Sequence, residues 1–326
     1  MTAMSHSRII AGLIATIVLL ALASVFVGAG ALSVGTLSAG GLDADGLRLL
    51  LVSRIPRTLA ALLAGAGLAV AGLIMQMLSS NRFVEPSTVG TTESASLGLL
   101  AVTILAPGLP VFGKMLIAAG FALAGTALFM AIIARLRLRS GMLVPLVGLI
   151  LSGIIGAGAS FLAYRFDLLQ SLGAWVSGDF SMVLRGRYEL LWIAFGLTIL
   201  AVFAADRFTL AGLGRDVATN LGLSYERVLA LGLVVVSLVA AVTIVSVGSI
   251  PFVGLVVPNL VSMLVGDNGR RTVPYVALSG AALVLACDLV GRLVRAPYEI
   301  PAGTIMGVLG ACVFLAIIFR RRPSLG

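Results

Sequence analysis

Ionisable side chains inside apolar stretches are the first candidates for chemistry in this sequence. Glu93 lies among threonines and serines, and Asp288 precedes Arg292 by four residues. A charge at mid-bilayer costs roughly 2.5 to 3.5 kcal/mol on insertion scales, so such groups should face a partner or an interior cavity. Asp288 and Arg292 can pair across one helical turn, which favours a structural role. Glu93 lacks such a neighbour, which predicts either a hydrated path or a protonated carboxyl within helix packing.

Other patterns give no support for catalysis. The stretch Gly108–Met115, GLPVFGKM, differs from a phosphate-binding G-x-x-x-x-G-K-[ST] because Met115 has no hydroxyl for magnesium. Two prolines, Pro110 within the stretch and Pro107 just before it, do not fit a strand-to-helix loop. One histidine, His6, and two cysteines, Cys287 and Cys312, cannot build a conventional metal cage or a disulfide framework. We therefore expect no catalytic residues, no metal ligands and no cofactor in this chain.

Composition places these residues in membrane-spanning elements. The chain has 326 residues, of which 60% are hydrophobic and 11% charged, and its mean hydropathy is +1.16. Each helical crossing needs roughly 20 apolar residues, so this length allows about ten crossings and no sizeable soluble domain. The formal charge of +9 is spread between apolar runs, as topology signals are, which argues against nucleic-acid binding. We predict an all-α, multi-pass protein with one transmembrane domain over residues 1–326.

The first apolar run follows Arg8 and is longer than the roughly 7–15 residues of a signal-peptide core, which predicts a retained span with both chain termini in the cytoplasm. Two later spans look irregular: one is short, and Gly248, Pro251, Gly254 and Pro258 interrupt another, which should therefore lie inside the bundle. The predicted spans are Ile9–Leu32, Thr58–Leu78, Pro86–Ala106, Met115–Ala134, Met142–Tyr164, Leu190–Ala205, Val228–Val247, Phe252–Gly266, Val273–Val290 and Ala302–Phe319.

Basic residues on the predicted exterior side oppose the positive-inside bias. An acidic partner on that face would explain them, and snorkelling of long side chains at the interface is the alternative. The exterior positions are Arg48, Arg54, Arg57, Lys114, Arg165, Arg185, Arg187, Arg292 and Arg295.

The longest interior segment runs from Asp206 to Arg227. Leu210, Leu213, Val217 and Leu221 follow helical spacing, with glycines as breaks, which predicts an amphipathic helical pair on the membrane surface. Such a segment suits a docking surface for a separate ATPase. An ordinary interfacial helix without a partner has the same pattern.

Three motifs carry a resemblance to a known family. The stretch Arg54–Gly98, RIPRTLAALLAGAGLAVAGLIMQMLSSNRFVEPSTVGTTESASLG, resembles the opening half of FecCD-type permeases. The stretch Gly248–Ile318 resembles the VGLxxPxxx and ExPxG motifs of that family, with Ser262 where the first motif usually has arginine. The segment Gly214–Ser224, GRDVATNLGLS, is also similar, so the resemblance covers most of the chain.

The resemblance implies a type II ABC importer permease fold in the bacterial cytoplasmic membrane. It implies a second permease subunit, identical or homologous, two ATPase subunits that bind ATP and Mg²⁺ inside, and a substrate-binding protein outside. By its matching motifs, the resemblance implies that Arg54, Arg57 and Arg292 dock the binding protein. ATPase coupling falls on the segment from Gly212 to Arg227, with Gly212, Arg215, Asp216, Leu221 and Gly222 as its expected residues. The translocation path and inner gate are expected at Asn81, Phe83, Glu93, Ser140 and Gly141.

The resemblance also implies the cargo, because this family imports ferric siderophores, haem and cobalamin. The stretch VEPSTVGTTES is more similar to the siderophore permeases, so an iron–siderophore complex is the first expectation and haem or cobalamin the alternative. A secondary transporter driven by an ion gradient is a further alternative, for which Glu93 would be the candidate relay.

Overall fold

The computed structural model of the protein describes residues 6–27, 44–136, 143–186, 188–266, 269–295 and 298–320. All the regular elements in these ranges are helices, as the composition predicted. In chain order they are α1 (His6–Phe26), α3 (Ala44–Leu49), the π-helical turn η1 (Leu50–Arg54), α4 (Ile55–Leu78), the 3₁₀ turn η2 (Pro86–Thr88), α5 (Thr91–Leu105), α6 (Val111–Arg135), α7 (Leu143–Arg165), α8 (Leu169–Ser177), the 3₁₀ turn η3 (Tyr188–Leu190), α9 (Leu191–Ala211), α10 (Arg215–Asn220), α11 (Tyr225–Val247), α12 (Val253–Val265), α13 (Gly269–Val294) and α14 (Ala302–Arg320).

Among the described residues, 7 helical stretches are long and apolar enough to cross a membrane. Each predicted span overlaps one of these stretches or one of the shorter apolar helices α5, α12 and α14. The chain is therefore a multi-pass membrane protein. The count of about ten crossings stays a prediction, because α5 and α12, with 15 and 13 residues, fall below the length of a full crossing.

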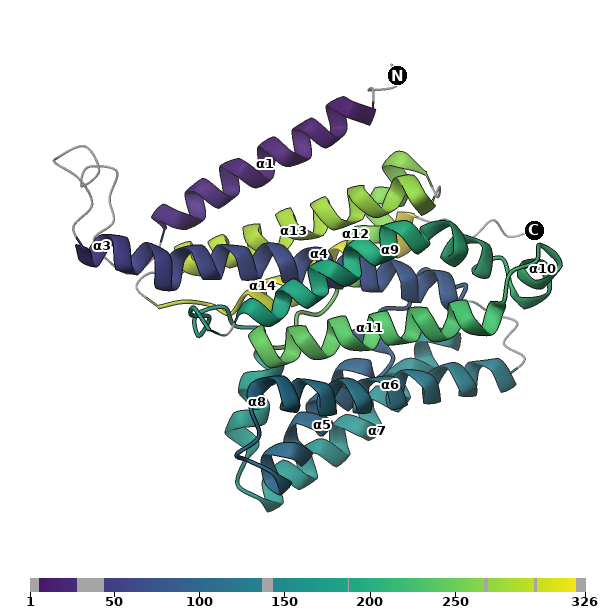
Figure 1. Cartoon of the computed structure of the whole chain (residues 1–326), viewed down its shortest axis with the longest axis horizontal. Coiled ribbons are helices and arrows are strands. Elements are labelled where there is room, and N and C mark those ends of the chain that lie inside the picture. Colours follow the sequence, from purple (N-terminus) through teal and green to yellow (C-terminus); the bar gives the residue numbers. More distant parts are fainter. Residues whose placement is uncertain are drawn as a thin grey trace.

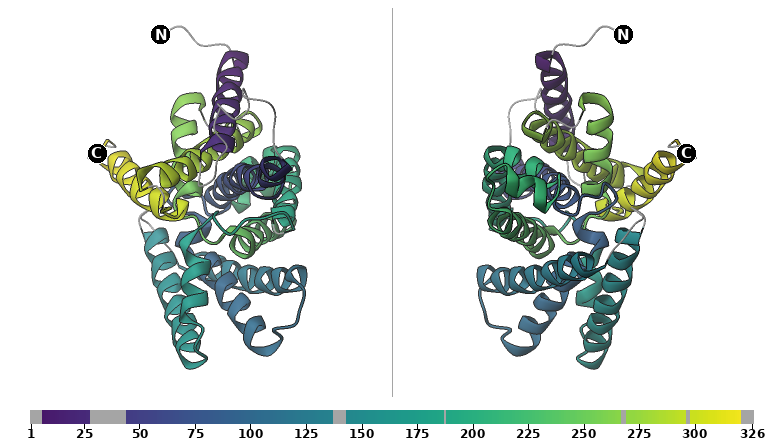
Figure 2. Two further views of the ribbon diagram at one scale, coloured as in Figure 1. Left: turned by 90° about the vertical axis from the view of Figure 1, so that its left-hand side faces the viewer. Right: turned by 90° about the vertical axis from the view of Figure 1, so that its right-hand side faces the viewer.

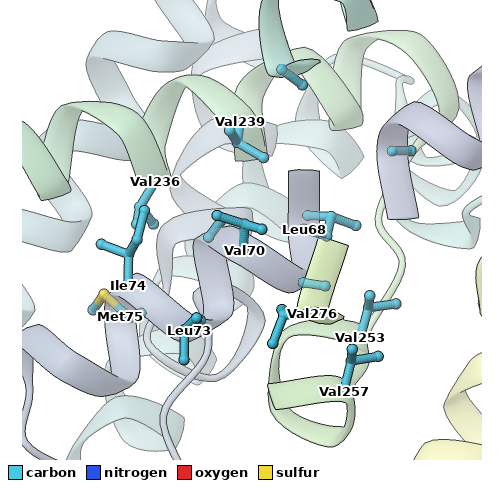
Figure 3. Packing of buried hydrophobic residues seen from close by; sticks show 14 of the residues in the cluster. Leu68, Val70, Leu73, Ile74, Met75, Val236, Val239, Val253, Val257 and Val276 are labelled. Carbon is cyan, nitrogen blue, oxygen red and sulfur yellow. The ribbon is translucent and has the colours of Figure 1, made fainter. Parts of the chain in front are cut away.

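Helix α4 forms the centre of the bundle, and it packs against α9, α11, α12 and α13. Figure 3 shows its side chains Leu68 and Ile74 among valines of α11, α12 and α13, all of them buried. Helix α1 lies at the edge, where it packs mainly on α13 (Figure 1). Figure 2 shows α5, α6 and α7 as a group on one side of the bundle.

Glycines let the backbone of α4 approach its neighbours closely. A side-chain carbon added at Gly65 would overlap the backbone of Gly280 on α13, and one added at Gly72 would overlap Gly254 on α12. In a membrane, where lipid is as apolar as leucine, such close approach contributes packing that the hydrophobic effect does not. The two crossings fix α12 and α13 against α4.

The segment that precedes α12 is irregular, as its glycines and prolines predicted. Phe252 has a positive φ of 65° at the start of α12. Backbone groups of this segment find partners far away in the sequence: the Ser249 N–H donates to the carbonyl of Trp175 on α8 at 2.9 Å. The first half of α12 is buried, so the prediction that this segment lies inside the bundle is confirmed.

Several helix boundaries differ from the prediction, and one helix was not predicted. Helix α9 extends to Ala211, beyond the predicted end at Ala205, because Asp206 and Arg207 are exposed on one face while Phe208 stays buried on the other. The helix that contains the second span begins at Ala44 rather than Thr58, through α3 and η1. Helix α8 was not predicted, because its nine residues are too few for a span.

Candidate functional site

Arg57 and Asp288 form the core of an ion-pair network where α4 begins and α13 ends. Arg57 Nη2 lies 2.7 Å from Asp288 Oδ1, and Arg57 Nη1 lies 2.7 Å from Glu299 Oε2. Arg292 donates to the other oxygen of Asp288 across one turn of α13, which confirms the predicted pair. One buried carboxylate thus joins two guanidinium groups, and a buried charge needs such partners.

The same network closes the end of α1. Arg292 Nη1 donates to the carbonyls of Ser24 at 2.9 Å and Val27 at 2.8 Å, and Arg54 Nη1 donates to Val27 at 2.6 Å. The last carbonyls of a helix lack partners within the helix and carry partial negative charge. Arg54 and Arg292 therefore act as caps that join α1 to α4 and α13.

The three arginines predicted to dock a binding protein are buried in this network. Arg54, Arg57 and Arg292 are only 5%, 9% and 4% exposed, so their charges point into the chain. The sequence suggested exposed groups because Glu299, Ser24 and the α1 carbonyls lie far away along the chain. Docking through these residues stays a prediction, and it requires the network to open. Among the described residues of the predicted exterior set, the exposed arginines are Arg48, Arg165, Arg185 and Arg295, and Arg187 lies outside the described residues.

The predicted coupling segment forms the short helix α10 between the ends of α9 and α11. Leu213, Val217 and Leu221 are 59%, 45% and 60% exposed, so the apolar residues of the pattern gather on the surface. Gly214 and Gly222 have positive φ values of 103° and 80°, which allow the turns on either side of α10. The predicted helical pair consists of the end of α9, which carries Leu210, and α10.

An exposed ion pair and a hydrogen bond link this segment to neighbouring parts of the chain. Arg215 Nη2 lies 3.0 Å from Glu226 Oε1 at the start of α11, and both side chains are exposed. Asp216 is exposed beside them, and Gly212 accepts a hydrogen bond on its carbonyl from Ser80 at 3.0 Å. Helix α10 and the first residues of α1 lie at the same end of the bundle (Figure 1).

Glu85 is a buried acidic residue that the sequence analysis missed. Its Oε1 accepts hydrogen bonds from the Phe252 N–H at 2.9 Å and the Ser87 hydroxyl at 2.6 Å, and the side chain is 2% exposed. The carboxyl thus caps the start of α12 inside the bundle, where a helix start attracts negative charge. Glu85-Pro86-Ser-Thr88 also forms a capping box around η2, which was a readable pattern in the sequence.

The predicted inner gate residues lie near a polar cavity at the end of α4. Asn81 is buried and accepts a hydrogen bond from the Phe83 N–H at 2.9 Å, while the Phe83 ring packs edge-on against Phe314 with centroids 5.9 Å apart. The cavity has a volume of about 330 Å³ and is lined by Asn81 and by residues of α4, α9 and α12. Ser140 and Gly141, the other predicted gate residues, lie outside the described residues.

Glu93 lines a second cavity, of about 230 Å³, between α5, α7 and α8. Among the described residues, its Oε2 is buried without a hydrogen-bond partner.

Lys114, the lysine of the G-x-x-x-x-G-K-like stretch, lies in the first turn of α6 after an irregular loop, and not in a strand-to-helix turn. The predicted site residues that the structure describes thus fall into four separate groups: the arginine network, the α10 segment, the cavity at the end of α4 and the cavity beside Glu93.

Comparisons with known proteins agree with this architecture. Residues 15–320 match the model of the FecCD transport family. The petrobactin import system permease protein YclN of Bacillus subtilis (strain 168) is 43% identical over 94% of this chain and 96% of its own length. The ferric-anguibactin transport system permease protein FatD of Vibrio anguillarum is 42% identical over 83% of this chain and 86% of its own.

A solved structure gives the same result for the fold. An inward-facing metal-chelate type ABC transporter superposes with a TM-score of 0.78 at 28% identity, covering 97% of this chain and 99% of the other. The family model covers the helices from α1 to α14, which include the arginine network, the Glu85 cap and α10. The chain belongs to the FecCD transport family.

Proposed function

We propose that this chain is the permease subunit of an ATP-driven importer that moves an iron–siderophore complex across the cell membrane. The observation that carries the proposal is the 43% identity with a petrobactin import permease over 94% of the chain. The helical bundle supports it, because several of its helices are long and apolar enough to cross a membrane and it encloses cavities of about 330 and 230 Å³. Haem or cobalamin is the alternative cargo.

ATP hydrolysis takes place on separate subunits that bind ATP and Mg²⁺. Helix α10 is their docking site, because an apolar surface at the inner end of a membrane protein needs a protein partner or the interface to cover it. Leu213, Val217 and Leu221 form this surface, and the Arg215–Glu226 pair fixes its angle against α11. Closure of the ATPases moves α10, and α9 and α11 carry the motion into the bundle. The chain termini are cytoplasmic, on the side of α10.

The opposite end of the bundle receives a substrate-binding protein. Its positive charge attracts an acidic partner, and the exposed Arg48, Arg185 and Arg295 make the first contacts. The Arg185 N–H donates to the Val52 carbonyl at 3.0 Å, which keeps Arg185 beside η1. Arg54, Arg57 and Arg292 bind the partner only after the internal ion pairs with Asp288 and Glu299 open. The arginines then pair with carboxylates of the binding protein instead. A second permease subunit completes the path.

Uptake in cells tests the cargo. A strain that lacks this gene is supplied with iron-55 siderophore, haem or cobalt-57 cobalamin, with and without the gene on a plasmid. Restored uptake of the ferric siderophore alone supports the proposal. Restored uptake of haem or cobalamin instead would identify that compound as the cargo and leave the assignment as an importer unchanged.

A further inference from the structure

The cavity around Glu93 has an unusual lining for the interior of a membrane protein. Helix α5 contributes Glu93 and Ser96, α7 contributes Gly156 and Ser160, and Ser249 comes from the irregular segment before α12. Hydroxyl groups thus surround a single carboxyl. None of the residues that line the cavity is basic, so the carboxyl has no counter-charge within the lining.

Two polar atoms of these residues lack a hydrogen-bond partner among the residues that the structure describes. Glu93 Oε2 and Ser96 Oγ are buried and unpaired, and Ser96 is only 3% exposed. A buried polar atom without a partner costs about 1–3 kcal/mol, and more when it is charged. Because both atoms belong to residues that line the same cavity, one ligand with a hydrogen-bond donor can satisfy them together.

The cavity opens on the exposed side of α7 and α8. Ser160 is exposed, and Val176 on α8 is 54% exposed. Ionisable groups within membranes face water-filled cavities or the interior of a bundle rather than lipid. The mouth at Ser160 therefore belongs on a hydrated path that a second subunit completes, and not on the lipid surface.

The size of the cavity limits what can enter. Its volume of about 230 Å³ is below the roughly 300–1,000 Å³ of pockets that hold a drug-sized ligand, so it admits one arm of a chelate and not the whole molecule. Gly156 provides part of this room, since a side-chain carbon there would lie 3.7 Å from Glu93 Cγ. Divalent hard cations favour six or more oxygen ligands, and usually several carboxylates, which one glutamate does not supply.

We propose that this cavity is a subsite for a protonated amine carried by the transported ferric chelate. A carboxylate recognises an ammonium group by a charge-assisted hydrogen bond, and the hydroxyl oxygens of Ser96 and Ser160 accept hydrogen bonds from its remaining N–H groups. The assignment rests on the proposed function, and it adds that the importer prefers chelates with a cationic arm. Glu93 makes the contact, and Gly156 leaves the space.

A fluorescence titration of the full chain in nanodiscs tests the subsite without transport. The chain has two tryptophans, and Trp175 lies on α8 between Leu172 and Val176, which line the cavity. In a Trp192→Phe background, n-butylammonium chloride should change Trp175 emission in a saturable way. The neutral n-butanol should not do so at the same concentrations, and neither should sodium chloride.

Variants separate the carboxylate from the space around it. Glu93→Gln keeps the shape and removes the charge, so the apparent dissociation constant for n-butylammonium should rise about tenfold or more. Gly156→Leu keeps the charge and fills the cavity, and should also abolish the saturable change. Gly158→Leu is the matched control, since Gly158 has open space around it, and it should bind as the parent does.

Each other outcome overturns the subsite. Absence of a saturable change, or an equal change in Glu93→Gln, would show that no amine binds through this carboxylate. A saturable response to sodium chloride alone would identify an inorganic cation site instead. Ferric-siderophore uptake that persists beside a failed titration would leave the importer function standing and reject only the amine subsite.

Discussion

Arg57 on α4 and Asp288 on α13 are 231 residues apart in sequence, yet their side chains form a buried ion pair of 2.7 Å. Asp288 also pairs with Arg292, so its single negative charge lies between two positive ones. This carboxylate joins the helix that forms the centre of the bundle to the helix on which α1 packs. The end of the bundle where α4 begins and α13 ends therefore depends on Asp288.

Replacement of Asp288 by Asn should destabilise the fold. Breaking a buried ion pair by removing one partner typically costs about 3–5 kcal/mol, because the other charge stays buried and uncompensated. Thermal unfolding of the purified chain in nanodiscs measures the loss. Glu299→Gln is the control, because Glu299 is 25% exposed and its pair with Arg57 should contribute about 1 kcal/mol or less. An Asp288→Asn protein as stable as the parent would contradict this role.

Glu85 should matter for stability even though it lies in a connecting segment. Glu85→Ala removes the acceptor of the Phe252 N–H inside the bundle, and an unsatisfied buried donor costs about 1–3 kcal/mol. Ser87→Ala, which leaves that acceptor in place, is the control and should cost less. Proteolysis of the chain in nanodiscs compares the two variants. Equal resistance of both variants would show that the cap on α12 is not important.

The apolar surface of α10 should be needed for coupling and not for folding. Leu221 is 60% exposed, so Leu221→Asp should insert normally and yet separate ATP hydrolysis from uptake in the assembled transporter. Asn220→Asp adds the same charge at the neighbouring exposed position without loss of apolar surface, and should remain coupled. The ratio of substrate imported to ATP hydrolysed is the measurement. An unchanged ratio for Leu221→Asp would place the ATPase contact elsewhere.

Arginines at the outer end should divide into two groups. Reversal of the exposed Arg48 and Arg185 to Glu should slow association of the binding protein, mainly at low salt, because screening acts over about 8 Å at physiological ionic strength. Reversal of the buried Arg54 and Arg57 should first lower thermal stability. Association rates in nanodiscs at low and high salt, together with unfolding temperatures, separate the effects. Full stability of the Arg54/Arg57 double variant would refute the internal network.

Long helices could be predicted from the sequence, because a membrane span requires a continuous apolar run. Helices α6 and α7 begin and end close to the predicted limits. The irregular backbone before α12 was also predictable, since Gly248 and Pro251 interrupt an apolar run there. The helical spacing of Leu213, Val217 and Leu221 predicted a helix near α10, and the charge within an apolar run singled out Glu93. The family resemblance added only their expected roles, which stay predictions.

The environment of the charged residues could not be predicted in this way. Arg57 reads as an exterior charge until Asp288 and Glu299 are brought to it by the fold. Glu85 reads as a loop residue because its main partner, the Phe252 N–H, lies 167 positions away. Contacts between residues so far apart produce no periodic pattern in the sequence. The capping box at Glu85 is a local pattern, and it could have identified Glu85 from the sequence.

Transport by the reconstituted complex tests the central claim most directly. The chain is placed in liposomes with its ATPase subunits, ATP and Mg²⁺ are enclosed on the ATPase side, and the binding protein loaded with iron-55 siderophore is added to the other side. The account predicts accumulation of iron-55 siderophore that requires both ATP and the ATPase. Accumulation without the ATPase, driven by a proton or sodium gradient, would contradict it.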